Sequence, residues 1–248
     1  MTLTDNELAM IEQLTYMSSE VATQAGISGF PGVKGGQKGM SIEQILECFD
    51  DDALERLEAK GNLDVGLLNG ENDKKFASCK EWADIIRYLK TSRLKDLVLA
   101  DTMTNSNGAT LALCFVENGN SNDAIVAFKG TSGGEEWIDN VLGLNESDTE
   151  CQKEALDYIE GLPYGNITVT GHSKGGNKAM YVAITSDKVI RCVAYDGQGF
   201  SQEFIDKYWA EIQKKAESSQ SILCPQIMCM PYFFPCQIPI KYTAKVLE

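Results

Sequence analysis

The chain has 248 residues, of which 43% are hydrophobic, and it carries a formal net charge of −14. This length is enough for one large hydrophobic core, as is common for α/β domains. The negative charge argues against nucleic acid as a partner and against electrostatic docking on anionic membranes.

Targeting and cofactor signals are weak throughout the sequence. The N-terminal residues lack a basic region followed by an apolar run, so we expect no signal peptide. No stretch approaches the roughly 18 apolar residues of a transmembrane segment. Eight cysteines are scattered and form no C-x-x-C pair, which favours reduced thiols and a cytoplasmic protein. With one histidine in the chain, we expect no zinc site, and no other cofactor is indicated.

Residues 1–95 carry helical patterns and no catalytic pattern. A capping box at residues 4–7 predicts a helix that runs to about Ser19. A second helix starts at Ser41, acidic helical segments continue through Leu57, and residues 82–89 form another amphipathic segment. We therefore expect residues 1–95 to form a helical cap or scaffold beside a sheet.

From Leu97 onward the pattern changes to short apolar strands that alternate with helices. This alternation predicts a mostly parallel, doubly wound sheet over residues 97–215. The predicted strands are 97–100, 109–116, 124–128, 167–170 and 189–195, and the predicted helices are 137–141, 149–162, 177–184 and 204–214.

The most informative stretch is Gly171-His172-Ser173-Lys174-Gly175, which lies between a predicted strand and a predicted helix. This is the G-x-S-x-G nucleophile elbow in the strand–turn–helix context that it requires. A serine on so sharp a turn has a strained backbone, so the residues two before and two after it must be small. Gly171 and Gly175 meet that requirement. The sequence therefore predicts Ser173 as a nucleophile.

Together these blocks resemble the class 3 (fungal-type) lipases and the lipase-like bacterial proteins of the α/β-hydrolase fold. The resemblance rests on residues 127–131, on Trp137 and Asp139, and on residues 168–176, and it covers roughly residues 97–215. It implies an oxyanion hole in which Thr131 and Lys174, the residue after the nucleophile, supply the donors. Acyl transfer independently needs two such preorganised donors.

The sequence departs from this family at the rest of the triad, which needs an acid and a histidine base after the serine. The one histidine, His172, adjoins Ser173, and we expect it to point away from the serine and to serve in packing. Lys174 and Lys178 are not expected to act as bases, because helix-surface lysines usually keep their ordinary pKa. Asp196, at the end of the next strand, is either a displaced triad acid or a residue that holds its turn through backbone hydrogen bonds.

Residues 218–248 are apolar, rich in Cys and Met, and broken by prolines. They contain no Asp or Glu before the terminal Glu248, so the acid position of the class 3 lipases is vacant. Two interpretations remain open. The segment is either an irregular covering of the sheet edge or a premature or frame-shifted end that has lost a histidine-bearing terminus.

The sequence thus predicts one α/β-hydrolase-like domain, with a helical cap over 1–95, a sheet core over 97–215 and an irregular tail over 218–248. The predicted function is a serine hydrolase of the lipase/carboxylesterase type that acts on a small-molecule or lipid ester and is impaired by the missing histidine. The alternative is a catalytically incomplete hydrolase-fold protein with a binding or scaffold role. The sequence carries no signal for an oligomeric state.

Overall fold

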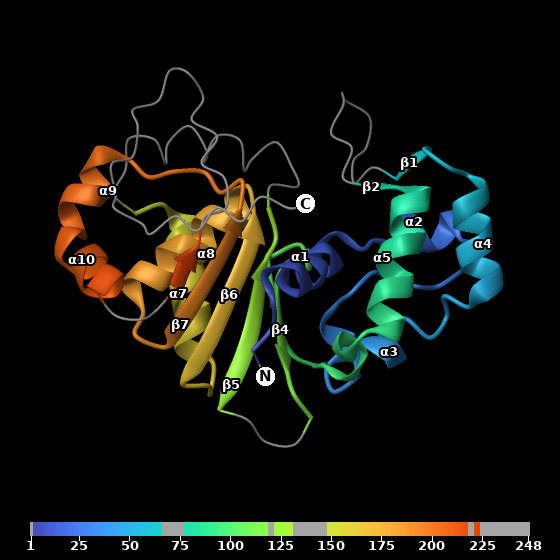
Figure 1. The fold of residues 1–248 in the computed structure, drawn as a ribbon, viewed down its shortest axis with the longest axis horizontal. Helices are drawn as coiled ribbons and strands as arrows, with labels where there is room; N and C mark the ends of the chain where they lie inside the picture. Colours follow the sequence, from blue (N-terminus) through green and yellow to red (C-terminus); the bar gives the residue numbers. More distant parts are fainter. Residues whose placement is uncertain (1, 66–76, 119–121, 131–147, 218–220, 224–248) are drawn as a thin grey trace. The chain divides into compact units, whose positions relative to one another are not determined.

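The structure is a computed structural model and describes residues 2–65, 77–118, 122–130, 148–217 and 221–223 (Figure 1). The chain divides into two compact units, Met1–Ser121 and Asn122–Glu248. Each unit contains both helices and strands.

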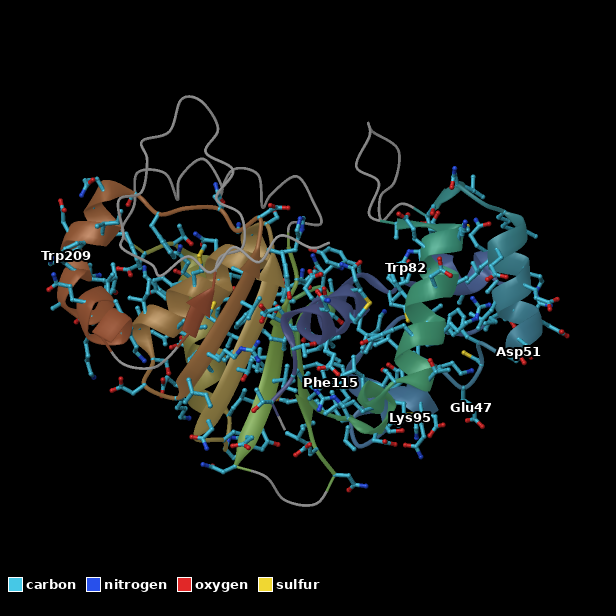
Figure 2. All side chains as sticks on the ribbon, in the orientation of Figure 1. Glu47, Asp51, Trp82, Lys95, Phe115 and Trp209 are labelled. Carbon is cyan, nitrogen blue, oxygen red and sulfur yellow. The ribbon has the colours of Figure 1, made fainter. Side chains whose placement is uncertain are left out.

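The first unit is mainly helical, as the sequence predicts for its first 95 residues. Helices α4 and α5 lie side by side (Figure 1), and Trp82 of α5 is buried (Figure 2). The helices are α1 (Asp5–Gln13), α2 (Ser19–Gln24), α3 (Ile42–Ile45), α4 (Asp51–Ala59) and α5 (Cys79–Thr91), with the 3-10 turns η1 (Leu14–Tyr16), η2 (Gly35–Gln37) and η3 (Arg93–Asp96). The strands are β1 (Asp64–Val65), β2 (Ala77–Ser78), β3 (Val98–Thr104) and β4 (Thr110–Val116).

Capping boxes start three of these helices. In each one a hydroxyl accepts the backbone N–H three residues later, and the Glu or Gln at that later position accepts the N–H of the cap. The boxes at Thr4 and Ser41 confirm the helix starts that the sequence predicts there. A third box at Ser78 opens α5.

The first predicted helix is shorter than expected. It ends at Gln13 instead of about Ser19, and a 3-10 turn follows. Met17 and Ser18 are then extended, and α2 begins at Ser19. Met17 is buried. In a continuous helix the helical period would set the direction of its side chain, whereas the bend allows the side chain to enter the core.

Strands β3 and β4 form an antiparallel pair in the first unit, with register shifts between Leu99 and Asp101 and between Met103 and Thr104. β4 carries much of the local core, since Phe115, labelled in Figure 2, is fully buried.

The second unit contains four parallel strands in the order β5-β6-β7-β8. β6 lies between β5 and β7, so the strand predicted over 167–170 is an interior strand, and α8 packs on β6 and β7 (Figure 1). The strands are β5 (Asp123–Phe128), β6 (Asn166–His172), β7 (Val189–Tyr195) and β8 (Ser221–Leu223); the helices are α7 (Glu150–Gly161), α8 (Lys174–Thr185), α9 (Gln202–Lys207) and α10 (Trp209–Glu217). The protein is therefore mixed α/β with a mostly parallel sheet.

Two features near the C-terminus differ from the prediction. The helix expected over 204–214 is divided at Tyr208, whose hydroxyl donates to Asp148 Oδ1 at 2.7 Å and whose ring packs on Phe204. These side-chain contacts compete with a straight helix, and Trp209 is left 42% exposed (Figure 2). Strand β8 lies in the segment expected to be irregular and pairs with β7.

Two other predictions concern residues outside the described part of the chain: the helix over 137–141 and the tail from residue 224 onward. Within the described residues, no helix has both the length and the apolar character needed to cross a membrane.

Candidate active site

Ser173 lies at the turn where β6 ends and α8 begins. Its backbone angles are φ 55° and ψ −120°, a combination that residues other than glycine rarely adopt. Holding a serine there costs on the order of 1–3 kcal/mol, and such strain persists only where the surroundings impose it. The contacts around Ser173 show what imposes it.

Two glycines allow the strand ends and the helix to approach closely. A Cβ on Gly171 would lie 2.4 Å from the carbonyl carbon of Gly175, and a Cβ on Gly175 would lie 2.2 Å from the carbonyl oxygen of Phe128. Both distances are far shorter than van der Waals contact. The first turn of α8 therefore sits directly on the ends of β5 and β6.

The backbone of Ser173 is tied to the end of β7. Its N–H donates to the carbonyl oxygen of Tyr195 at 2.9 Å, and its carbonyl accepts from the N–H of Gln198 at 3.3 Å. The same carbonyl accepts from the N–H of Asn177, the first bond of the helix, at 3.0 Å. Because β6 and β7 are parallel and His172 pairs with Tyr195, the turn that follows β7 lies beside Ser173.

Asp196 is the first residue of that turn and has a positive φ of 45°. Its carboxylate Oδ2 lies 3.9 Å from Nε2 of His172. Burial lowers the pKa of His172 below its ordinary value, and the charge of Asp196 partly opposes this shift. The imidazole is therefore largely neutral at pH 7. His172 is partly buried, and its imidazole lies beside the carboxylate of Asp196.

The two lysines near Ser173 also differ from the expectation. Lys174 is 5% exposed and Lys178 is 3% exposed, so the prediction that both lie on the helix surface is wrong. The two are four residues apart and share one face of α8, and that face is covered. The sequence did not reveal this, because lysines at this spacing are usually read as a solvated face. Lys129, which follows β5, is buried as well.

The sequence-predicted site residues are thus only partly placed. Ser173, Lys174, Gly171, Gly175 and Asp196 lie together where the parallel strands end. The N–H of Lys174 belongs to the first turn of α8, where the helix dipole favours negative charge. Thr131, expected as the other oxyanion donor, and the family positions Trp137 and Asp139 lie outside the described residues.

Sequence reasoning overlooked one contributor to this site. Asn177 is 7% exposed and uses its side-chain amide to hold the turn after β7. Its place four residues after Ser173 on a helix was the available signal, since residues at that spacing share a helix face.

The fold and the turn at Ser173 define a class: a mixed α/β protein with parallel strands and a strained serine between a strand and a helix. A family model described as Mbeg1-like matches residues 89–227, more than half of the chain. The chain therefore belongs to the Mbeg1-like family, a lipase-like family.

Solved structures and curated proteins do not refine this assignment further. A solved structure described as "Crystal structure of M37 lipase" is similar to this chain with 14% sequence identity and a TM-score of 0.36. The match covers 67% of this chain and 66% of that one, slightly less than two thirds of its length. No curated protein matches the sequence.

Proposed function

We propose that this chain is a serine hydrolase of the lipase/carboxylesterase type. One observation carries the proposal: Ser173 keeps a side chain at φ 55°, ψ −120°, between two glycines whose Cβ atoms would collide with backbone. Strain of this kind is found where a side chain must be presented in a particular direction. Membership of a lipase-like family supports the same reading.

In the proposed reaction, the hydroxyl oxygen of Ser173 bonds to the acyl carbon of an ester, and the N–H groups of Lys174 and Thr131 bind the resulting oxyanion. The carbon–oxygen bond to the alcohol then breaks, and the alcohol leaves with the proton that the Ser173 hydroxyl has lost. Water attacks the acyl-serine, releases the acid and restores the hydroxyl of Ser173.

Proton transfer is the weak step of this scheme. General-base catalysis contributes about 10²–10⁴ in rate, and His172 is the one histidine in the sequence. We propose Asp196 as the acid of the site, since its carboxylate faces His172 at the turn tied to Ser173. With this partial set we expect slow turnover, sustained mainly by the oxyanion donors and by substrate binding.

The alternative function is a catalytically incomplete hydrolase-fold protein that binds or scaffolds. The histidine count favours it, because the one histidine of the sequence adjoins Ser173 and none follows the serine to serve as the triad base. Both proposals use the same fold, and they differ in whether Ser173 forms a covalent bond.

The finer features of the protein are also proposals. We propose a single, doubly wound α/β-hydrolase-like domain related to class 3 and bacterial lipase-like proteins, with residues 1–95 as its helical cap. We propose a small-molecule or lipid ester as substrate and the cytoplasm as location. The eight cysteines scattered along the sequence support that location.

A fluorophosphonate probe tests the proposal directly. We expect slow formation of an adduct that mass spectrometry places on Ser173, and no adduct on that peptide in Ser173→Ala. Ser106→Ala, at an exposed serine of the β3–β4 turn, is the matched control and should label like the wild type. If no adduct forms at Ser173 even after long incubation, the binding or scaffold function is correct instead.

An esterase assay gives a second measure. We expect turnover of a short-chain p-nitrophenyl ester by the wild type to stay close to that of Ser173→Ala, since a base for the serine is lacking. Robust turnover that disappears with Ser173→Ala would instead mean that a base exists. Lys178→Met would then show whether the buried lysine one turn along α8 supplies it.

A further inference from the structure

Asn177 lies on α8 with every polar atom of its buried side-chain amide engaged. Its Nδ2 donates to the carbonyl oxygen of Gln198 at 2.9 Å and to that of Gly199 at 3.2 Å. Its Oδ1 accepts from Nε2 of Gln152 at 2.8 Å. Three segments therefore meet at this one amide: the start of α7, the first turns of α8 and the turn after β7.

We propose that Asn177 is a positioning residue that holds the turn of residues 196–199 against Ser173 and so sets how readily the serine reacts. This inference rests on the proposed hydrolase function. Asn177 acts through the turn and through the backbone of Ser173, which places it behind the reacting atoms.

The hydrogen bonds at Ser173 show why the turn needs this support. The bond from the N–H of Gln198 to the carbonyl of Ser173 is long, at 3.3 Å, and by itself fixes the turn weakly. Asp196 enters the same turn with a positive φ, which is unfavourable for a residue with a side chain. The two bonds from Asn177 supply the additional restraint that a strained turn requires.

Gln152 determines which way the amide of Asn177 faces. The Oε1 of Gln152 accepts the N–H of Thr149 at 2.8 Å, which leaves its Nε2 to donate to Asn177. Asn177 must then offer its oxygen to Gln152, and its nitrogen is directed to the two carbonyls of the turn. Gln152 and Asn177 are 5% and 7% exposed, so water competes little for these bonds.

Asn177→Asp is the most selective variant, because it keeps the size of the side chain and the acceptor for Gln152. The second carboxylate oxygen would face two carbonyl oxygens, and the restraint on the turn would become repulsion. We expect the maximal rate of fluorophosphonate labelling at Ser173, kinact, to fall about 10-fold or more, since misplacement of about 1 Å costs up to 10²-fold. The half-saturating probe concentration should change little, because the turn is not proposed to bind the probe.

A second variant guards against a folding defect at position 177. In Gln152→Glu the carboxylate no longer donates to Asn177, so the amide either turns away from the two carbonyls or faces an acceptor. We expect the same selective loss of kinact. Asn105→Asp is the matched control, because Oδ1 of Asn105 only accepts N–H groups, from Asn107 and Ala109, and an Asp keeps both bonds.

Hydrogen exchange at the N–H of Gln198 provides the structural readout. Asn177→Asp and Gln152→Glu should both speed exchange at Gln198, and Asn105→Asp should not. Unchanged exchange, or unchanged kinact in variants that fold, would overturn the inference. If the wild type forms no adduct at Ser173, the hydrolase proposal fails, and exchange at Gln198 still decides whether Asn177 holds the turn.

Discussion

The two units of the chain treat unfavourable backbone angles in opposite ways. In the described residues of the first unit, every residue with a positive φ is a glycine, at positions 26, 29, 32, 39, 61 and 108. In the described residues of the second unit, the residues with a positive φ are Ser173 and Asp196. Glycine adopts these angles without strain, whereas serine and aspartate do so at a cost.

This difference distinguishes turns that serve the fold from turns that present a side chain. The first unit meets its requirements by local means, with capping boxes at Thr4, Ser41 and Ser78 and with glycines at the turns. In the second unit the two residues with positive φ lie where adjacent parallel strands end, and the backbone of Ser173 bonds to Tyr195 and Gln198, on either side of Asp196. Unfavourable backbone angles kept at two adjacent strand ends support a functional role for both residues.

The largest effect on stability is expected from adding a methyl group at Gly175, where α8 packs most closely on the end of β5. Gly175→Ala would put a Cβ 2.2 Å from the carbonyl oxygen of Phe128, so backbone must move. We expect the free energy of unfolding to fall by about 3 kcal/mol or more. Gly161→Ala, at the end of α7 with no atom within 4 Å of the added Cβ, is the control and should be neutral or stabilising. Urea unfolding of both variants measures the difference, and equal stabilities would contradict it.

Two substitutions test whether Ser173 is strained and whether the glycines with positive φ in the first unit are free of strain. Ser173→Gly should raise the free energy of unfolding by about 1 kcal/mol, since relief of strain exceeds the entropy cost of glycine. Gly108→Ala, with φ 73° and open space around the added Cβ, should lower it by about 1 kcal/mol. Thermal unfolding measures both variants, and we expect the two changes in stability to have opposite signs. A loss of stability in Ser173→Gly would mean that Ser173 is not strained.

A smaller effect is expected at an ion pair in the first unit. Hydrogen bonds from Arg93 at 2.6 Å to both carboxylate oxygens lower the pKa of Glu7 from 4.5 to about 2, with burial opposing the shift. Because this pKa is lower in the folded state, the stabilisation is present above pH 4.5 and is lost as the pH falls toward 2. Arg93→Met should therefore lower stability at pH 7 and make progressively less difference below pH 4.5.

Urea unfolding at pH 7, 4.5 and 3 checks this prediction. The control is Lys214→Met, which removes one of the two lysine partners of Asp187, in a pair whose side chains are 68% and 82% exposed. Exposed pairs contribute little, so this variant should match the wild type at every pH. If the free energies of unfolding of wild type and Arg93→Met differ by the same amount at all three pH values, Arg93 stabilises the protein through packing and not through the ion pair.

Local features of this protein could be predicted from its sequence. The capping boxes at Thr4 and Ser41, the strand over 189–195 and the strand that leads to Ser173 all follow from patterns a few residues long. Such patterns act through neighbouring backbone groups and side-chain spacing, so no distant part of the chain is needed to interpret them. The requirement for small residues at 171 and 175 is of the same kind.

Tertiary structure alone decided what surrounds Ser173. The sequence did not reveal that Lys174 and Lys178 are buried, that His172 faces Asp196, or that Asn177 joins α7, α8 and the turn after β7. Each of these facts depends on the register between β6 and β7 and on how closely α8 packs on the strand ends. Register and packing are set by the whole buried surface of the sheet, which brings together residues that are distant in the chain.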